Sequence, residues 1–168
     1  MIDLLSEFRR SLGVTVEWSP DEACLPVGRV RVERIGRGLY QPAEAAGEPC
    51  LLVPVTEDGA LVDLVAFPRS APSDWLLRTG NGWALGLADS IGSHMWAEKV
   101  RLFDSPVDWV RGKRAGICVV DWESPEVRSL DVLPRVICSP RIGSLLRRAL
   151  TRPPRLPQIS LMEARHAA

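Results

Sequence analysis

One pattern in the second half of the chain constrains the fold more than any other. Three times an apolar segment runs into Ser-Pro and then into a stretch compatible with a helix: VRLFDSPVDWVRG, GICVVDWESPEVRSL and RVICSPRIGSLLRRAL. A serine just before a helix accepts hydrogen bonds from free N–H groups of the first turn, and proline at the first helical position loses no donor that the helix needs. We therefore expect Ser105, Ser124 and Ser139 to be helix N-caps.

These junctions also predict how the second half is layered. Successive Ser-Pro pairs are 19 and then 15 residues apart, which suits compact strand-to-helix units. The apolar segments are continuous rather than alternating, which is typical of strands covered on both faces. The pattern predicts a compact βα-repeat layer, parallel or mixed, over about residues 95–151.

The first half has the signals of an antiparallel sheet. Residues 27–38 alternate apolar and charged side chains, which indicates a strand with one wet face. Asp58-Gly59 lies between two apolar runs, and Asn81-Gly82 lies between two more. Both dipeptides favour the tight turns of β-hairpins, because their residues tolerate positive φ angles. The pattern predicts two hairpins within a meander.

The fold class we expect is α+β, an antiparallel meander followed by the compact βα-repeat layer. Apolar residues at helical spacing over 2–12 predict an amphipathic helix before the meander. The chain length favours a single domain over 1–151, in which 1–90 holds the helix and meander and 95–151 the repeat layer. The proline-rich residues 152–168 are expected to form a tail.

The amino-acid composition indicates the class of the protein and its expected location. With 46% hydrophobic and 25% charged residues, the chain is typical of globular proteins. Its four cysteines include no C-x-x-C pair, which favours reduced thiols over a zinc site. The first residues do not resemble a signal peptide, and no apolar run approaches the ~20 residues of a spanning helix. We expect a cytoplasmic location and no membrane partner.

The ends of the predicted strands are where a site is expected, because ligands of open α/β sheets bind outside the carboxyl ends of strands. Asp104, Asp121 and Glu123 lie at two of these ends. In an extended segment Asp121 and Glu123 face the same side, so that with Asp104 they are candidate catalytic residues holding Mg²⁺. Acids near a helix start also interact favourably with the helix dipole and need no other role.

Residues 99–151 resemble a degenerate Toprim module, the α/β domain of primases, topoisomerases and related nucleases. The resemblance lies in FDSPVDWV, in GICVV, and in VICSPRIGSLLRRAL. It implies Mg²⁺-dependent phosphoryl chemistry, with Asp104 at the place of the family's first glutamate. The family's later Asp-x-Asp pair is absent, because Ser139-Pro140-Arg141 stands there. The upstream strands and LRTGNGWALG are also similar to uncharacterised proteins of bacterial prophage and plasmid regions.

Arginine gathers in two places. From residue 127 onward the chain has eight Arg against two acids, a net charge of +6, although the whole chain is neutral. A basic stripe can neutralise several phosphates of a nucleic acid. The candidate nucleic-acid-binding residues are Arg29 and Arg31 on the early strand, together with Arg141, Arg147, Arg148, Arg152 and Arg155 on the last helix and beyond it.

These observations favour a non-catalytic binding or accessory protein for the nucleic-acid transactions of a mobile genetic element. One alternative is a Mg²⁺-dependent nuclease or primase-like enzyme, which alone would need a cofactor. Another is a protein-interaction module whose arginines meet an acidic protein surface. The expected partner is accordingly DNA or an acidic protein, and the sequence does not indicate an oligomeric state.

Overall fold

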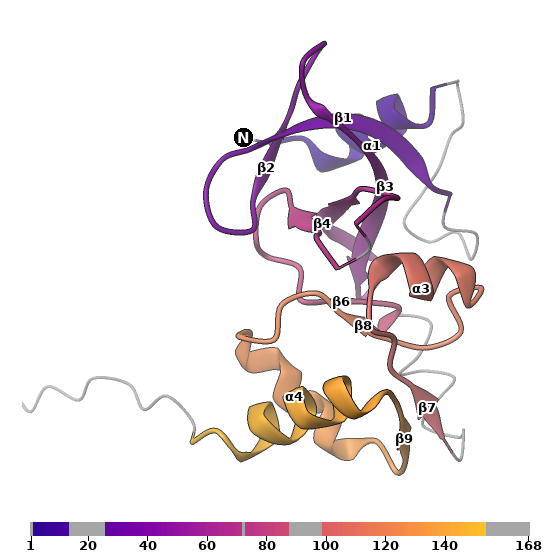
Figure 1. Ribbon diagram of the computed structural model, residues 1–168, viewed down its shortest axis with the longest axis vertical. Helices are drawn as coiled ribbons and strands as arrows, with labels where there is room; N and C mark the ends of the chain where they lie inside the picture. Colours follow the sequence, from indigo (N-terminus) through magenta and orange to yellow (C-terminus); the bar gives the residue numbers. More distant parts are fainter. Residues whose placement is uncertain (1, 14–25, 72, 88–98, 154–168) are drawn as a thin grey trace, which may run out of the picture.

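The computed structural model describes residues 2–13, 26–71, 73–87 and 99–153 (Figure 1). Over these ranges the chain combines helices with a curled antiparallel sheet, which confirms the α+β class. None of the helices in the described ranges is both long enough and apolar enough to span a bilayer.

A five-stranded antiparallel sheet forms the first half, in the order β2-β1-β3-β4-β5. Its strands are β1 (Gly28–Arg34), β2 (Tyr40–Pro42), β3 (Glu48–Glu57), β4 (Ala60–Phe67) and β5 (Leu76–Leu77). β3 returns beside β1 rather than beside β2. The sheet curls so far that Leu39, just before β2, forms a parallel bridge with Leu77 of β5. The two outer strands are thereby joined, and the curled sheet approaches a small barrel.

The predicted hairpin at Asp58-Gly59 is confirmed. β3 ends at Glu57 and β4 begins at Ala60, with φ of 48° at Asp58 and 76° at Gly59. Positive φ at both central residues is the backbone that a two-residue type I′ turn requires. This turn is fixed by local chemistry, and it sets the register of the two longest strands.

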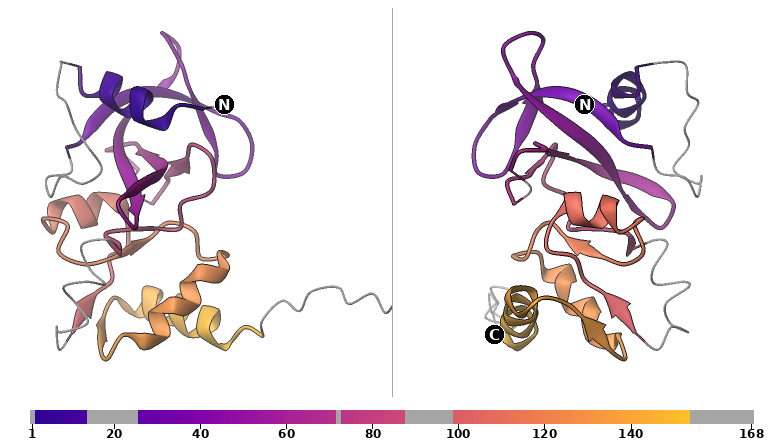
Figure 2. Two further views of the ribbon diagram at one scale, coloured as in Figure 1. Left: turned by 180° about the vertical axis from the view of Figure 1, so that it is seen from behind. Right: turned by 45° about the vertical axis from the view of Figure 1, so that its right-hand side comes forward.

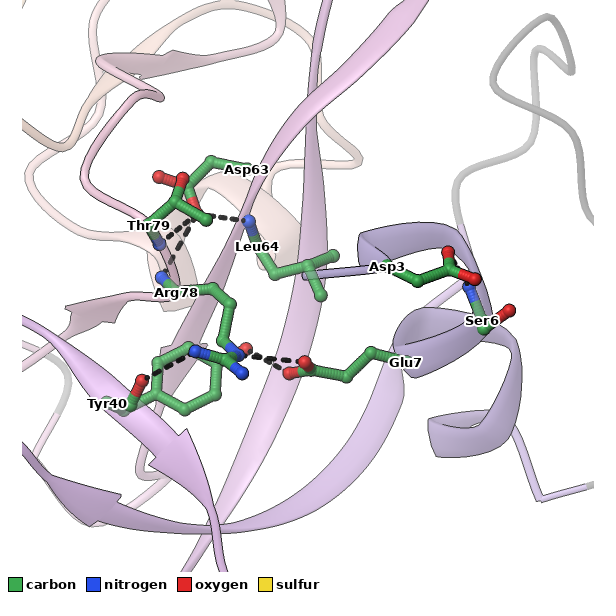
Figure 3. A network of polar contacts seen from close by, with 8 residues as sticks. All are labelled: Asp3, Ser6, Glu7, Tyr40, Asp63, Leu64, Arg78 and Thr79. Atoms are coloured by element: carbon green, nitrogen blue, oxygen red, sulfur yellow. Dashed lines mark hydrogen bonds and ion pairs between the residues drawn. The ribbon is translucent and has the colours of Figure 1, made fainter. Parts of the chain in front are cut away.

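The hairpin predicted at Asn81-Gly82 is wrong. β5 pairs with β4, whereas the next strand, β6 (Ala84–Leu85), pairs with β8 (Cys118–Val119) of the second half. The intervening loop, 78–82, wraps around the fully buried carboxylate of Asp63. That carboxylate accepts five backbone hydrogen bonds of 2.8–3.0 Å, from the N–H groups of Leu64, Arg78, Thr79, Asn81 and Gly82. Figure 3 shows the first three of these bonds. These long-range bonds override the local turn preference.

The predicted first helix is α1 (Leu4–Ser11), capped by Asp3, which accepts a hydrogen bond from the Ser6 N–H. It packs over one face of the curled sheet, as the view from behind shows (Figure 2). Glu7 fixes it there through a mostly buried ion pair of 2.8 Å with Arg78 and a hydrogen bond of 3.1 Å from the Tyr40 hydroxyl (Figure 3).

The second half is a mixed layer of short strands with helices (Figures 1 and 2). β7 (Val100–Arg101) and β9 (Val136–Ile137) are parallel, β6 and β8 are antiparallel, and a parallel bridge between Leu102 and Ile117 connects the two pairs. The helices are α3 (Pro106–Arg111), the 3₁₀ helix η1 (Pro125–Val132) and α4 (Pro140–Thr151). Each follows one of the predicted Ser-Pro junctions.

All three serines act as predicted. The hydroxyl of Ser105 accepts from the N–H of Asp108, Ser124 accepts from Glu126, and Ser139 accepts from Ile142, at 3.2–3.4 Å. The second segment is a 3₁₀ helix rather than an α-helix. Ser-Pro therefore marks where each helix starts without fixing which type of helix follows.

The two halves share a hydrophobic core. The cluster that fills the curled sheet also contains buried side chains from beyond residue 100, among them Phe103, Val107 and Trp109. A second cluster joins Trp83 and Leu87 to the strands of the small layer and to Ile142 of α4. Apolar side chains of the second half thus complete the core of the first.

Candidate functional site

The three candidate catalytic acids do not come together. Asp121 turns back on its own loop and accepts a hydrogen bond of 2.9 Å from the Glu123 N–H. Glu123 forms an ion pair of 2.6 Å with Arg152 at the far end of α4. Nowhere in the described ranges do three His, Cys, Asp or Glu side chains form a group that could hold a metal ion. The convergence required by the predicted magnesium site is therefore not found.

Asp104 instead joins the first junction to the third. Its Oδ1 accepts a hydrogen bond of 2.7 Å from the Ser139 hydroxyl and one of 3.3 Å from Arg141 Nε. Arg141 Nη2 also donates to the main-chain carbonyl of Asp104, at 2.9 Å. The parallel pairing of β7 with β9 produces this contact, because the carboxyl ends of parallel strands lie at the same edge of a sheet.

The arginines of α4 are largely engaged within the protein. Arg141 and Arg152 form ion pairs with acids, and Arg147 Nε donates to the Gly143 carbonyl of its own helix. Arg148 is exposed and has no side-chain partner among the described residues. Arg155 lies outside the described residues. The last helix therefore presents less free positive charge than its sequence predicts.

A different basic surface lies on the curled sheet. Arg29 is directly opposite Leu51, and Arg31 is opposite Pro49. Cross-strand partners share a face of a sheet, so both arginines and both apolar side chains lie on the same face. They line a groove of about 520 Å³, which we call the arginine groove, together with Arg69 and with Val30, Cys50 and Ser70.

Arg69 was not predicted from the sequence. Leu51 is paired with Phe67 at the end of β4, and Arg69 follows two residues later, in the turn beyond the strand, where it lines the same groove as Pro49. This position depends on the β3–β4 register, and nothing in the local sequence around Arg69 indicates it. The hairpin at Asp58-Gly59 sets that register. Pairing the residues of β3 and β4 one by one from this turn could have placed Arg69 beside Arg29 and Arg31.

The backbone of β1 directs Arg29 into the arginine groove. A side chain at Gly28 would collide with Ser11 of α1, so position 28 points toward the helix. Its neighbour Arg29 points the other way, because successive side chains of a strand alternate between faces. Arg31 donates to the Gly47 carbonyl at 2.9 Å. Arg29 and Arg69 are exposed and have no side-chain partner within the described part of the chain.

Glu57, at the end of β3, has a carboxylate oxygen that is buried and unsatisfied in the described structure. Oε1 of Glu57 is buried without a hydrogen-bond partner among the described residues. Burial raises the pKa of Glu57 above its ordinary value, and the negative charges of Glu126 and Asp58 raise it further. Ionised Glu57 therefore destabilises the folded state.

Replacing Glu57 with Gln is expected to stabilise the protein near neutral pH, by up to about 0.5 kcal/mol. A carboxylic acid whose pKa is higher in the folded than in the unfolded protein destabilises the fold at pH values above that pKa. Once the acid is protonated in both the folded and the unfolded protein, it no longer affects stability. The gain should therefore fade as the pH falls through the raised folded pKa and disappear at about pH 3, below the ordinary glutamate range. Urea unfolding at both pH values measures it, with the exposed Glu44→Gln as the control. A gain that persists unchanged in acid would contradict this explanation.

Comparisons with family models, with curated proteins and with solved structures each found no match to this chain. The Toprim resemblance of residues 99–151 stays a prediction.

Proposed function

We propose that this protein is a non-catalytic nucleic-acid-binding accessory protein and that it contacts the phosphate backbone through the arginine groove. The observation that carries the proposal is the make-up of the groove: Arg29, Arg31 and Arg69 line it together with apolar residues, and none of its described lining residues is a carboxylate. Guanidinium groups bind phosphate oxygens in paired hydrogen bonds, and each neutralised phosphate releases counterions.

The groove favours backbone contact over base recognition. None of the described residues that line it is aromatic, and aromatic rings are the stacking platforms that proteins use to hold single-stranded bases. Its polar groups are mainly cationic, and cations that contact phosphates position a protein without reading sequence. We therefore propose binding that is largely independent of sequence and strongly dependent on salt.

The proposal does not extend to catalysis, because Glu123 is paired with Arg152 and Asp121 accepts a hydrogen bond from its own loop. We also propose a role in the transactions of a mobile genetic element and a Toprim-like character for residues 99–151. Only the sequence resemblance supports these two points.

A cytoplasmic location is also part of the proposal. Its support is the state of the cysteines: Cys50 and Cys118 are buried free thiols. Burial raises the pKa of the Cys50 thiol to about 11, and it raises the pKa of Cys118 as well. Thiols of this kind are unreactive and are compatible with a reducing compartment.

Fluorescence anisotropy with labelled single-stranded and duplex oligonucleotides tests the proposal. The wild-type protein is compared with Arg29→Gln/Arg69→Gln, which removes the two groove arginines that have no partner in the described structure. The matched control is Arg147→Gln/Arg148→Gln, which removes the same charge from α4. We expect the groove variant to bind at least about tenfold more weakly at low salt, since each lost phosphate contact removes a favourable counterion release. The control should bind about as well as the wild type.

Two results would contradict the proposal. If the wild-type protein binds neither oligonucleotide at low salt, a phosphate backbone is not its ligand, and an acidic protein surface becomes the better candidate partner. If the α4 variant loses affinity while the groove variant keeps it, the contact surface is the last helix. Thermal unfolding of both variants confirms that each is folded.

A further inference from the structure

A cavity that shares no lining residue with the arginine groove lies in the second half. Its volume is about 850 Å³, and its walls come from β7, α3 and the segment that follows β9. Ligand sites for small molecules have volumes of this order. The cavity includes the edge where Asp104 meets Ser139, which is where ligands of open α/β sheets bind.

Three cations line this cavity and have no acidic partner among the residues that the structure describes. Lys99, Arg101 and Arg111 are exposed, line the cavity and form no ion pair with any described residue. The guanidinium of Arg101 lies over the ring of Phe103, 4.7 Å from its centroid. A cation held against an aromatic ring is positioned before a ligand arrives, which reduces the entropy cost of binding an anion.

Each of the two carboxylates that line the cavity has one oxygen that accepts hydrogen bonds within the protein. Oδ1 of Asp104 accepts from Ser139 and Arg141, whereas Oδ2 of Asp108 accepts from the Ser105 hydroxyl at 2.6 Å. The second oxygen of each carboxylate accepts no hydrogen bond from the described residues. Free carboxylate oxygens are strong acceptors for hydroxyl donors. The cavity thus combines cations for an anionic group with acceptors for neutral hydroxyl groups.

We infer that this cavity binds a sugar phosphate, either free or as part of a nucleotide. The phosphate is held by Lys99, Arg101 and Arg111, and the sugar hydroxyls donate to the free oxygens of Asp104 and Asp108. This site is separate from the arginine groove and does not depend on the proposed nucleic-acid function. It also assigns a role to Asp104 that requires no metal ion and no catalysis.

Isothermal titration calorimetry on the full chain tests this assignment with four probes: ribose 5-phosphate, adenosine 5′-monophosphate, ribose and inorganic phosphate. We expect at least one of the two sugar phosphates to bind about tenfold more tightly than ribose and inorganic phosphate, because only it engages cations and acceptors together. Whichever sugar phosphate binds more tightly identifies the source of the ligand. If neither binds, or if inorganic phosphate binds as tightly as both, the assignment is overturned.

The variant Arg101→Gln/Arg111→Gln locates the site. It should lose the sugar-phosphate affinity, whereas Arg147→Gln/Arg148→Gln on α4 should retain it. Oligonucleotide binding should be unchanged in the cavity variant, so failure of this inference is distinguishable from failure of the proposed function. Thermal unfolding establishes that the variant is folded. A folded cavity variant that keeps its sugar-phosphate affinity would overturn the inference.

Discussion

Asp63→Asn is expected to lower the free energy of unfolding by at least about 3 kcal/mol, the range typical of leaving buried polar or charged groups without partners. The wild-type carboxylate is fully buried and accepts five backbone N–H bonds, three at Oδ1 and two at Oδ2. An asparagine has one acceptor oxygen, and its amide nitrogen would face N–H donors at the other position. Urea unfolding monitored by tryptophan fluorescence measures the loss.

The control for this experiment is Asp131→Asn. Asp131 is exposed on η1 and has no side-chain partner in the described ranges, so its replacement should change stability by no more than about 0.5 kcal/mol. Both variants remove one negative charge, so any difference between them reflects the buried hydrogen bonds. Equal stability of the two variants would show that loop 78–82 is held by something other than Asp63.

Gly116→Ala is expected to cost about 2–4 kcal/mol, through backbone strain and collision together. Gly116 has φ of 139°, and an added Cβ would collide with the main-chain oxygen of Arg101 in β7. That oxygen accepts the hydrogen bond from the Ile117 N–H, and the Gly116 carbonyl accepts one of 2.9 Å from the Trp109 indole. The collision therefore disturbs the bridge between Leu102 and Ile117 and the anchoring of α3.

Gly36→Ala separates the two contributions. Gly36 has a comparable φ of 117°, but nothing lies within 4 Å of the added Cβ. This variant should show the cost of backbone strain alone, about 1–2 kcal/mol. Thermal unfolding of both variants gives the difference, which we assign to the collision at Gly116. If Gly36→Ala is as destabilising as Gly116→Ala, the close approach of the two segments is not important for stability.

The features predicted correctly from the sequence are those fixed by neighbouring residues. Ser105, Ser124 and Ser139 cap helices because a serine oxygen reaches N–H groups only two or three positions ahead. The Asp58-Gly59 turn formed as predicted because its two residues supply the positive φ angles themselves. The α+β class follows from such local signals together with hydrophobic periodicity.

The features that the sequence did not predict depend on distant partners. Asn81-Gly82 has the same turn chemistry as Asp58-Gly59, yet its N–H groups bond a carboxylate 18 and 19 residues away. The contribution of Arg69 to the groove depends on strand register. The free charge of α4 is reduced by Asp104 and Glu123, which come from other elements. The amino-acid composition gives the number of arginines near α4 but does not reveal that some of them are paired with acids.

The most direct test of the nucleic-acid proposal is the salt dependence of oligonucleotide binding. For a single strand, the logarithm of the affinity falls with the logarithm of salt concentration at a slope of about −0.7 for each phosphate neutralised. If Arg29 and Arg69 each neutralise one phosphate, the slope for Arg29→Gln/Arg69→Gln should be shallower than that of the wild type by about 1.4, while Arg147→Gln/Arg148→Gln should keep the wild-type slope. A groove variant with the wild-type slope would contradict the account.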